Sequence, residues 1–464
     1  MVKRIMCALH FARMAQPKGT WCRRFAANAS SLGGIQRVNL GFFGRMNAGK
    51  STLMNFLTQQ QTSIVDATAG TTADTKVTLL ELHGIGPCKV FDTAGLDESG
   101  DLGAKKLRKT AQVAKECDLI LIAYRPYVET AEQALQEPGT RKILDIARSR
   151  NRQVALIENV SDEHHGSGFV ELGRFNDIPR ARVNPTRPEG FDAFVAFLER
   201  LHVSASRASQ VPLLPLKFMG KDKRLLMNIP MDAETPSGRL LRPQANVQEF
   251  ALSHYTSTSA FRMDLAAGRS RDLYIKAQER SRFQECVLRE QPDLIVTDSQ
   301  AMDLVYPWLS LPDFQHVALT TFSIVVLSHA GADLDRFIAG LRAFDSLEGG
   351  DRVLVAEACN HNRITQVCED IGTVQIPRHI RKKGRSDQPE IIIEHAFGRE
   401  FPDDELRRYS LVIHCGGCMI DSQKLQARIE DCKELGVPIT NYGLLLSHVQ
   451  SPGALQKVVA PFLS

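Results

Sequence analysis

The sequence predicts a protein of the α/β class with three domains and mainly parallel sheets. Short apolar runs that read as buried strands alternate with stretches of helical periodicity over most of the chain, an order typical of parallel sheets covered by helices. A strand, loop and helix near the start carry a complete phosphate-loop pattern, which is found in α/β nucleotide-binding domains. The length of 464 residues also exceeds what one ordinary core organises, so several domains are expected.

The overall composition is that of a globular protein, and its charge separates a short leader from the rest. Hydrophobic residues make up 43% and charged residues 24% of the chain, and the net charge is +4. Residues 1–37 contain seven basic residues and no acid, which leaves 50 basic against 53 acidic residues, a balance of −3. A mildly acidic body gives no electrostatic reason to expect a nucleic-acid partner. No apolar run approaches the roughly 18 residues that span a bilayer, so no membrane partner is expected.

Residues 1–36 predict an organelle transit peptide. The stretch is rich in Arg, free of acids, and contains Ser, Ala and scattered Leu, Phe and Trp, a composition typical of such leaders. The alternative is a basic tail without a targeting role. A transit peptide predicts that the mature protein works in the matrix of a mitochondrion or of a mitochondrion-derived organelle, the hydrogenosome.

Residues 37–203 predict a phosphate-loop nucleotide-binding domain. The strand-like run "QRVNLGFFG" and the helix-like run "STLMNFLTQQQ" flank the pattern Gly44-x-x-x-x-Gly49-Lys50-Ser51. The glycines allow backbone N–H groups to turn towards phosphate oxygens, and the N-terminus of the helix adds its dipole. Lys50 can reach the β- and γ-phosphates of a nucleotide, and the hydroxyl of Ser51 can ligate Mg²⁺.

Two further segments of this domain supply the parts of a nucleotide switch. A predicted strand ends in Asp-Thr-Ala-Gly at 92–95, where Asp92 can hold a metal-bound water and the Gly95 amide can meet a γ-phosphate. Thr72 lies in the loop "AGTTADT", which can close over the metal. The segment 76–92 also reads as two strands joined by a Gly/Pro turn, an antiparallel edge pair. The catalytic candidates are Lys50, Thr72, Asp92 and Gly95.

The base-recognition motif departs from the guanine-binding pattern at one position. The run "QVALIENVSDE" reads as a strand that ends in Asn159-Val160-Ser161-Asp162, where GTPases usually carry Asn-Lys-x-Asp. The Asp162 carboxylate can accept from guanine N1 and N2, and Asn159 can bond the guanine edge. Val160 replaces the Lys whose stem flanks the base. The two retained residues predict GTP rather than ATP.

This first domain resembles the Era and TrmE branch of the small GTPases. The likeness rests on Asn47 within the loop, on the paired threonines Thr71 and Thr72, and on the Asp-Thr-Ala-Gly motif. Position 96 is Leu, so the Gln that orients water in Ras-like proteins is absent. The resemblance implies that K⁺, held partly by Asn47, stabilises charge in the transition state; the alternative is an Asn that merely closes a turn. The nucleotide-binding candidates are Gly44, Asn47, Ala48, Gly49, Lys50, Ser51, Thr52, Thr71, Thr72, Asp92, Asn159 and Asp162, with Ser51 and Thr72 also on Mg²⁺.

Residues 211–308 predict a small α/β domain that follows a polar, Pro-bearing linker. The runs 223–232 and 292–300 read as strands, with a long polar helix around 273–290 between them. No catalytic constellation is found here, so dimer or domain contacts are the expected role. Anion binding by the basic loop at 236–244 is the less favoured alternative.

Residues 314–464 predict a third domain with a parallel, Rossmann-like sheet. Helical stretches separate several short apolar runs that are bounded by turn signals, which is the alternation of a parallel sheet. These runs, which we interpret as strands, are 316–328, 351–359, 409–415 and 437–440.

Three thiols and two imidazoles follow two of these strands. Cys359 and His361 come after one strand, and His414, Cys415 and Cys418 come at the end of another. Because the loops beyond the carboxyl ends of parallel strands converge on one crevice, the two segments can meet there. Three thiolates could hold a [4Fe–4S] cluster with one open iron, a Cys₃His zinc site or a redox disulfide. Spacing alone leaves these three open.

The chain from about residue 38 to 450 resembles the HydF family of [FeFe]-hydrogenase maturation proteins. Cys-x-His followed about fifty residues later by His-Cys-x-x-Cys, behind an Era-like GTPase domain, looks like this family. The runs "PSGRLLRPQ", "PDLIVTDSQA", "GDRVLVAEACNH" and "VIHCGGCM" agree with the likeness, in the order of GTPase, dimerisation and cluster domains. One departure is Asn362, where family members often carry a further His.

The resemblance implies a GTP-hydrolysing scaffold with a [4Fe–4S] cluster on Cys359, Cys415 and Cys418. His361 and His414 become candidates for the open iron or for the bridging diiron subcluster precursor, and a hydrogen-bonded role beside the cluster is the alternative for each. The implied partners are the [FeFe]-hydrogenase apoprotein, which receives the precursor, and its radical-SAM maturases, with the scaffold a homodimer. The competing hypothesis is an Era- or TrmE-like RNA- or ribosome-associated GTPase with a zinc site in its C-terminal half.

Overall fold

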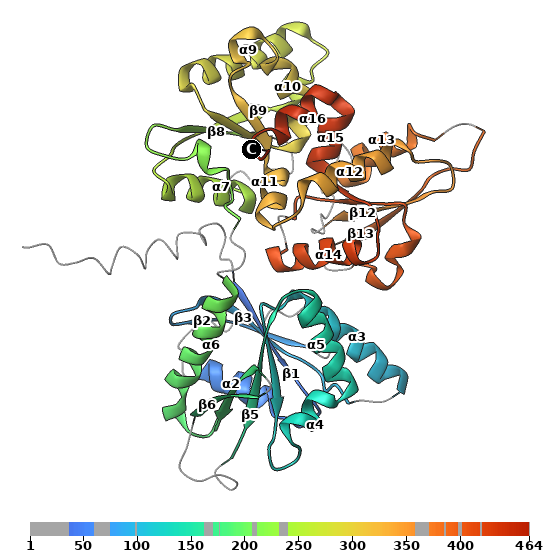
Figure 1. The fold of residues 1–464 in the computed structure, drawn as a ribbon. Helices are drawn as coiled ribbons and strands as arrows, with labels where there is room; N and C mark the ends of the chain where they lie inside the picture. The colour runs from blue at the N-terminus through green and yellow to red at the C-terminus, as the bar shows by residue number, and fades with distance from the viewer. Residues whose placement is uncertain are drawn as a thin grey trace, which may run out of the picture.

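The protein is described by a computed structural model in which three sheets carry the helices (Figure 1). The structure describes residues 37–59, 75–97, 100–161, 170–175, 177–206, 211–231, 240–357, 371–384, 387–397, 401–417 and 420–463. Among the helices of these residues, none combines the length and the apolar content needed to cross a lipid bilayer.

The first sheet has seven strands in the order β2-β3-β1-β4-β5-β7-β6. Its strands are β1 (Val38–Phe43), β2 (Lys76–Leu82), β3 (Gly86–Asp92), β4 (Leu119–Tyr124), β5 (Gln153–Asn159), β6 (Val170–Phe175) and β7 (Ile178–Val183). Its helices are α2 (Lys50–Gln59), α3 (Gly100–Glu116), α4 (Ala131–Gln136), α5 (Pro138–Ser149) and α6 (Phe191–Ser206). The edge strands β2 and β6 run antiparallel to their neighbours and the others run parallel, so the predicted antiparallel pair is confirmed.

Two hydrophobic cores cover the two faces of this sheet. One core includes Leu53 of α2 and Phe194 of α6, and the other includes Ile143 of α5. The six residues of β4, "LILIAY", are all buried, as expected for a parallel strand that is covered on both faces. The carboxyl ends of β1, β3, β4 and β5 therefore reach one common edge, where the phosphate loop begins.

The second sheet has four parallel strands in the order β11-β10-β8-β9. They are β8 (Arg224–Met231), β9 (Ser257–Asp264), β10 (Leu294–Thr297) and β11 (Ala318–Thr321). Its helices are α7 (Arg242–Ser253), α8 (Leu265–Gly268), α9 (Leu273–Glu290), α10 (Met302–Leu309) and α11 (Phe322–His329). The predicted strands β8 and β10 and the predicted helix α9 are confirmed.

One predicted strand is wrong in both length and place. The apolar run 316–328 divides into β11 and α11, and β11 pairs with β10 of the second sheet. The Thr321 side chain accepts a hydrogen bond from the Ile324 N–H at 3.3 Å and caps α11. Since the run is apolar throughout, its periodicity does not separate a buried strand from a buried helix. The predicted boundary between residues 308 and 314 falls inside this sheet.

The third sheet is also parallel, as predicted, in the order β13-β12-β14-β15. Its strands are β12 (Arg352–Glu357), β13 (Ile392–Phe397), β14 (Leu411–His414) and β15 (Ile439–Asn441). Its helices are α12 (Leu334–Asp345), α13 (Ile376–Arg381), α14 (Ser422–Glu434), α15 (Tyr442–Gln450) and α16 (Pro452–Val459).

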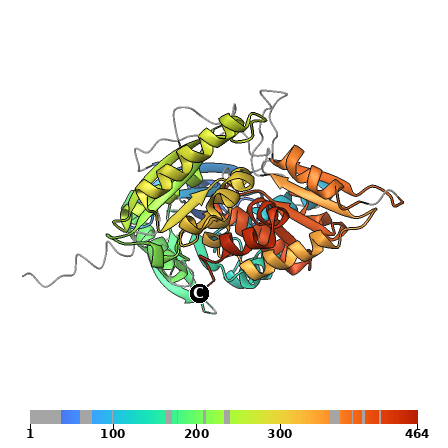
Figure 2. The ribbon, with the colours of Figure 1, turned by 90° about the horizontal axis from the view of Figure 1, so that it is seen from above.

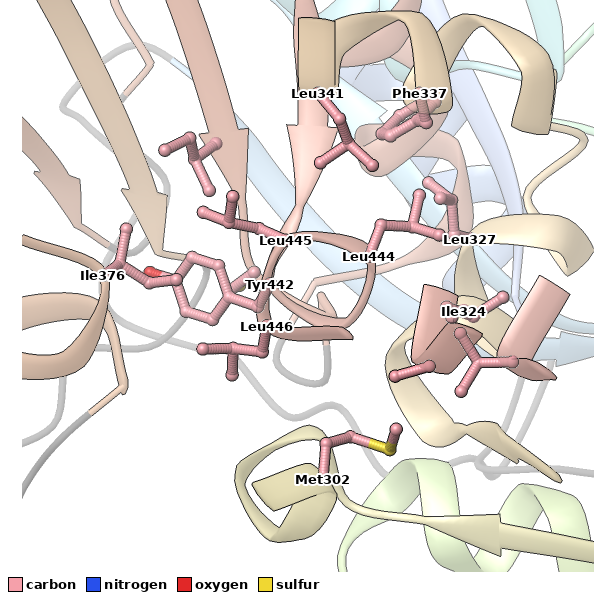
Figure 3. Close-up of a cluster of buried hydrophobic side chains, with 14 of the residues drawn as sticks. Met302, Ile324, Leu327, Phe337, Leu341, Ile376, Tyr442, Leu444, Leu445 and Leu446 are labelled. Atoms are coloured by element: carbon pink, nitrogen blue, oxygen red, sulfur yellow. The ribbon is translucent and has the colours of Figure 1, made fainter. Parts of the chain in front are cut away.

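A single hydrophobic core joins the second and third sheets. Figure 3 shows Met302 of α10 and Ile324 of α11 in the same cluster as Phe337 of α12 and Leu444 of α15. Seen from above, the second and third units lie side by side over the first domain (Figure 2). Apolar burial of this kind is the main stabilising term in folding, so these two sheets pack as one body.

Candidate functional sites

The phosphate loop borders a cavity of about 410 Å³ at the carboxyl edge of the first sheet. Gly44, Asn47 and Gly49 have φ angles of 143°, 63° and 86°. Gly adopts positive φ without steric cost, and Asn is among the residues that tolerate the left-handed region. The residue types at these positions therefore suit a loop whose amide groups turn inward.

This cavity is lined by Lys50, Ser51 and Asp92, which are predicted to contact the phosphates, Mg²⁺ and a metal-bound water. Lys50 Nζ donates to the carbonyls of Gly44 at 3.1 Å and Arg45 at 2.8 Å, so the ammonium is folded back on its own loop. Ser51 Oγ donates to Asp92 Oδ2 at 2.5 Å. A hydroxyl beside a carboxylate is an oxygen donor set that fits Mg²⁺.

The strand end that carries the switch motif packs directly on the phosphate loop. The Leu96 N–H donates to the Gly44 carbonyl at 3.2 Å, and Thr93 Oγ1 donates to the Phe42 carbonyl at 2.7 Å. A Cβ at Gly95 would lie 2.9 Å from the Met46 nitrogen, which is closer than side-chain carbons come. Gly95 is thus required for the close approach of the two segments.

Seven predicted residues line the cavity, and four lining residues were not predicted as site residues. The predicted ones are Asn47, Gly49, Lys50, Ser51, Thr52, Asp92 and Gly95. The others are Met46, Lys76, Thr93 and Arg125. Arg125 directly follows the apolar strand β4 at the carboxyl edge of the sheet, a position that could have drawn attention to it. Predicted residues Thr71, Thr72 and Asp162 lie outside the described residues.

The base-recognition segment is tied to the phosphate loop. Asn159 is buried, and its Nδ2 donates to the Ala48 carbonyl at 3.0 Å. The preceding Glu158 is buried and pairs with Arg182 at 2.6 Å. Burial opposes ionisation of Glu158, but hydrogen bonds from Tyr124 and Arg182 outweigh it and hold the pKa of the carboxyl below its usual value. This network anchors the end of β5 and so positions Asn159.

The second candidate site begins at Cys415, which directly follows β14 and is only 8% exposed. The Gly417 N–H donates to Cys415 Sγ at 3.4 Å, and the Cys415 N–H donates to the Ala356 carbonyl of β12 at 2.9 Å. An amide aimed at the sulfur suits a thiolate that ligates iron or zinc. Since β12 and β14 are parallel neighbours, the chain leaves both strands at one edge.

The other predicted thiol ligands are beyond what the structure describes. Cys359, two positions after the end of β12, lies outside the described residues, as do His361 and Cys418. Within the described part of the chain, no group of three or more His, Cys, Asp or Glu side chains is arranged to hold a metal ion.

His414 is a buried neighbour of Cys415 whose two ring nitrogens both have partners. Nδ1 lies 2.7 Å from the Cys415 carbonyl, and Nε2 lies 3.1 Å from Nη1 of the buried Arg428. Burial, reinforced by the Arg428 charge, lowers the pKa of His414 to about 3, so the ring is neutral. This geometry favours the hydrogen-bonded alternative over direct ligation of iron by His414.

The remaining described cysteines behave as core thiols. Cys88, Cys117, Cys286 and Cys432 are buried and unpaired by disulfides. Burial raises the pKa of Cys88 and of Cys432 to about 12, which keeps both protonated. This environment is that of reduced thiols buried in the protein core.

The helix that follows the cysteine loop contacts the first domain. Asp431 of α14 accepts from Arg150 at 2.6 Å and from Lys115 at 2.7 Å, and Asp421 accepts from Lys89 at 3.0 Å. Figure 1 shows α14 on the side of the third unit that faces the first. Lys89 lies on β3 and Lys115 on α3, so the elements before and after the switch motif reach the N-cap and the body of α14.

Family models match three successive parts of the chain. The model described as 50S ribosome-binding GTPase matches residues 39–160. The models described as hydrogen maturase F dimerization domain and hydrogen maturase F tetramerization domain match residues 216–331 and 335–461. The first domain is therefore a GTPase domain, and the two later descriptions support oligomerisation. The sequence predicted the last part as a cluster-binding domain.

Curated relatives that are GTPases match about a third of this chain. The tRNA modification GTPase MnmE of Natranaerobius thermophilus is 31% identical over 163 residues, which are 34% of this chain and 33% of that protein. The GTPase Der of Campylobacter hominis is 27% identical over 165 residues, 34% of this chain and 33% of that protein. The chain thus spans about a third of the length of the curated relatives it matches. A GTPase domain followed by both hydrogen maturase F domains is found in this one chain, and the chain belongs to the hydrogen maturase F family.

Proposed function

We propose that the protein hydrolyses GTP and serves as a scaffold that holds a diiron subcluster precursor and delivers it to [FeFe]-hydrogenase. The observation that carries the proposal is the union, in one chain, of a phosphate-loop cavity with two hydrogen maturase F domains. Cys415 lies at the carboxyl edge of the third sheet, and its sulfur accepts a hydrogen bond from the Gly417 N–H. This thiol supplies one ligand position.

The residues of the first cavity divide the work of GTP hydrolysis. Lys50 and the loop amides bind the β- and γ-phosphates, and Ser51 and Asp92 hold Mg²⁺ directly or through water. Bound Mg²⁺ supplies charge neutralisation on the phosphate oxygens. Gly95 keeps the switch strand against the loop, and Asn159 with Asp162 reads the guanine base.

Asn47 provides the test of the proposed K⁺ dependence. We expect slow GTP hydrolysis that is faster in K⁺ than in Na⁺. The change Asn47→Gly keeps the positive φ accessible and removes the amide oxygen, so the ratio of the rates in K⁺ and Na⁺ should fall to about one. Phosphate release measured in both salts decides this. Undiminished K⁺ stimulation in the variant would exclude Asn47 as a ligand, and equal turnover of ATP and GTP would overturn the guanine assignment.

Cys415 provides the test of the proposed cluster. Cys359, Cys415 and Cys418 would hold a [4Fe–4S] cluster, and the chemistry it supplies is an open iron for a bridging ligand of the cargo. After anaerobic reconstitution and reduction, we expect an electron paramagnetic resonance signal that Cys415→Ala abolishes. Cys432→Ala is the control, since this thiol is also buried but lies on α14 and not at the strand end. Zinc in the wild-type protein, with no reducible cluster signal, would instead support the competing hypothesis.

The partners and compartment complete the proposal. The hydrogenase apoprotein and the radical-SAM maturases are the proposed partners, and the composition of residues 1–36 supports a mitochondrial or hydrogenosomal matrix. Hydrolysis would gate partner exchange, because a segment ordered by a γ-phosphate is released on its loss. The contacts of β3 and α3 with α14 support this coupling, since α14 follows the cysteine loop.

The competing hypothesis of an RNA- or ribosome-associated GTPase rests on the first domain alone. The matched GTPase model covers residues 39–160, and the similarity to MnmE and Der covers about a third of the chain. This hypothesis does not account for the matches of residues 216–331 and 335–461 to the hydrogen maturase F models.

A further inference from the structure

We propose that Arg125 is a nucleotide-binding residue that supplies, from the end of β4, the cation that the guanine motif lacks at Val160. The inference rests on the proposed GTPase function and adds a residue that no sequence motif of the domain contains.

Arg125 is placed where the phosphate loop meets the base-recognition segment. Its half-buried side chain lines the 410 Å³ cavity. A Cβ at Gly49 would lie 3.7 Å from Arg125 Nη2 and would also touch Asn159 Nδ2. Three groups from β4, the loop and β5 therefore converge on one point. Since Asn159 begins the base-recognition segment, its closeness to the same point places Arg125 on the side of the cavity nearer the base.

Val160 is unable to perform this task. The side chain is 2% exposed, and the Val160 N–H donates to the Val183 carbonyl at 3.0 Å. The residue is therefore fixed in the interior beside β7, and it has neither a charge nor a long stem. A cation near the base has to come from another strand end, and β4 is the neighbour of β5 in the sheet.

The chemistry of a guanidinium suits this position. Its planar face can stack on a purine, and its N–H groups can donate to a ribose oxygen or to the α-phosphate. In this structure the guanidinium carbon lies 6.0 Å from the ring centre of Tyr127, at the outer limit of a cation–π contact, and Tyr127 is exposed. That contact is too weak to hold the side chain away from a bound nucleotide.

Titration of the full-length protein with fluorescent GTP and GDP tests the proposal. Arg125→Ala should weaken the affinity for both nucleotides by about tenfold, because base and ribose are common to the two. Arg125→Lys should recover part of the loss, and kcat at saturating GTP should stay within about twofold of wild type. Arg148→Ala is the control, since it removes an arginine that is 77% exposed on α5 and should leave both affinities unchanged.

Each contrary result has a distinct meaning. Unchanged affinity in Arg125→Ala would overturn the inference while leaving the GTPase function intact. Weakened GTP binding with unchanged GDP binding, or a large fall in kcat, would place Arg125 on the γ-phosphate and would also overturn it. If circular dichroism shows that Arg125→Ala does not fold, Arg125→Gln takes its place under the same criteria. A wild-type protein that binds neither nucleotide would refute the proposed function itself.

Discussion

Replacing Gly49 with Ala should lower the affinity for GTP by at least about a hundredfold, or about 2.8 kcal/mol. The φ angle of Gly49 is 86°, and the left-handed region costs an L-residue roughly 1–2 kcal/mol. The new Cβ would also overlap Nδ2 of Asn159, which donates to the Ala48 carbonyl. Displacing this amide removes the group that we propose to read the guanine edge. Equilibrium titration with fluorescent GTP measures the loss.

Gly86 offers a matched control for this effect. Its φ angle is 94°, so Ala meets the same backbone strain, but no other residue of the described part of the chain, apart from the two chain neighbours, has an atom within 4 Å of an added Cβ. Gly86→Ala should therefore lower the melting temperature slightly and leave GTP affinity unchanged. Binding by Gly49→Ala within threefold of the wild-type value would show that the loop does not hold the nucleotide in this geometry.

Replacing Arg150 with Ala should cost about 3–5 kcal/mol at the contact between the first domain and α14. The Arg150 side chain is 1% exposed and bonds Asp431 at 2.6 Å and the Ala427 carbonyl at 3.2 Å. Its removal leaves Asp431, itself only 8% exposed, with Lys115 as its remaining cation at 2.7 Å. Hydrogen exchange of the backbone amides, followed at increasing urea concentrations, measures the effect. In the variant, α14 should lose its protection at urea concentrations that leave the sheets folded.

The exposed Arg148 and a double-mutant cycle separate this contact from general loss of charge. Arg148 pairs with Asp145 at 3.5 Å with both side chains over 70% exposed, so Arg148→Ala should change stability by at most about 0.5 kcal/mol. The effects of Arg150→Ala and Asp431→Ala should be non-additive, as expected of residues in direct contact. Additive effects, or an Arg150→Ala variant that resembles Arg148→Ala, would mean that the ion pair does not hold α14.

Elements with a strong local signal could be predicted, and elements without one could not. The phosphate loop, the β2–β3 pair and α9 each carry a motif, a turn or a period within a short stretch. The strand β9, "STSAFRMD", is mostly polar and has no such signal, although it completes the second sheet. The run 316–328 is predicted as one strand but forms β11 and α11, because a uniformly apolar stretch fits a strand and a helix equally well.

The candidate sites show the same division. The types and spacing of Lys50, Ser51, Asp92 and Asn159 mark the nucleotide site, because phosphate, Mg²⁺ and guanine each require particular groups in a known order. Arg125 belongs to no such motif. It reaches the cavity only because β4 pairs with β5 and with β1. Likewise, no residue pattern around His414 indicates that its Nε2 is hydrogen-bonded to Arg428.

Residue patterns within single segments were thus enough to establish the α/β class, the nucleotide loop and the cysteine-bearing strand end. The packing of distant segments decided that β11 joins the second sheet, that His414 is held by Arg428, and that Arg150 meets Asp431, 281 positions along the chain. The physical reason is that a motif encodes backbone conformation and chemistry locally, whereas burial and charge pairing depend on which surfaces the whole chain brings into contact.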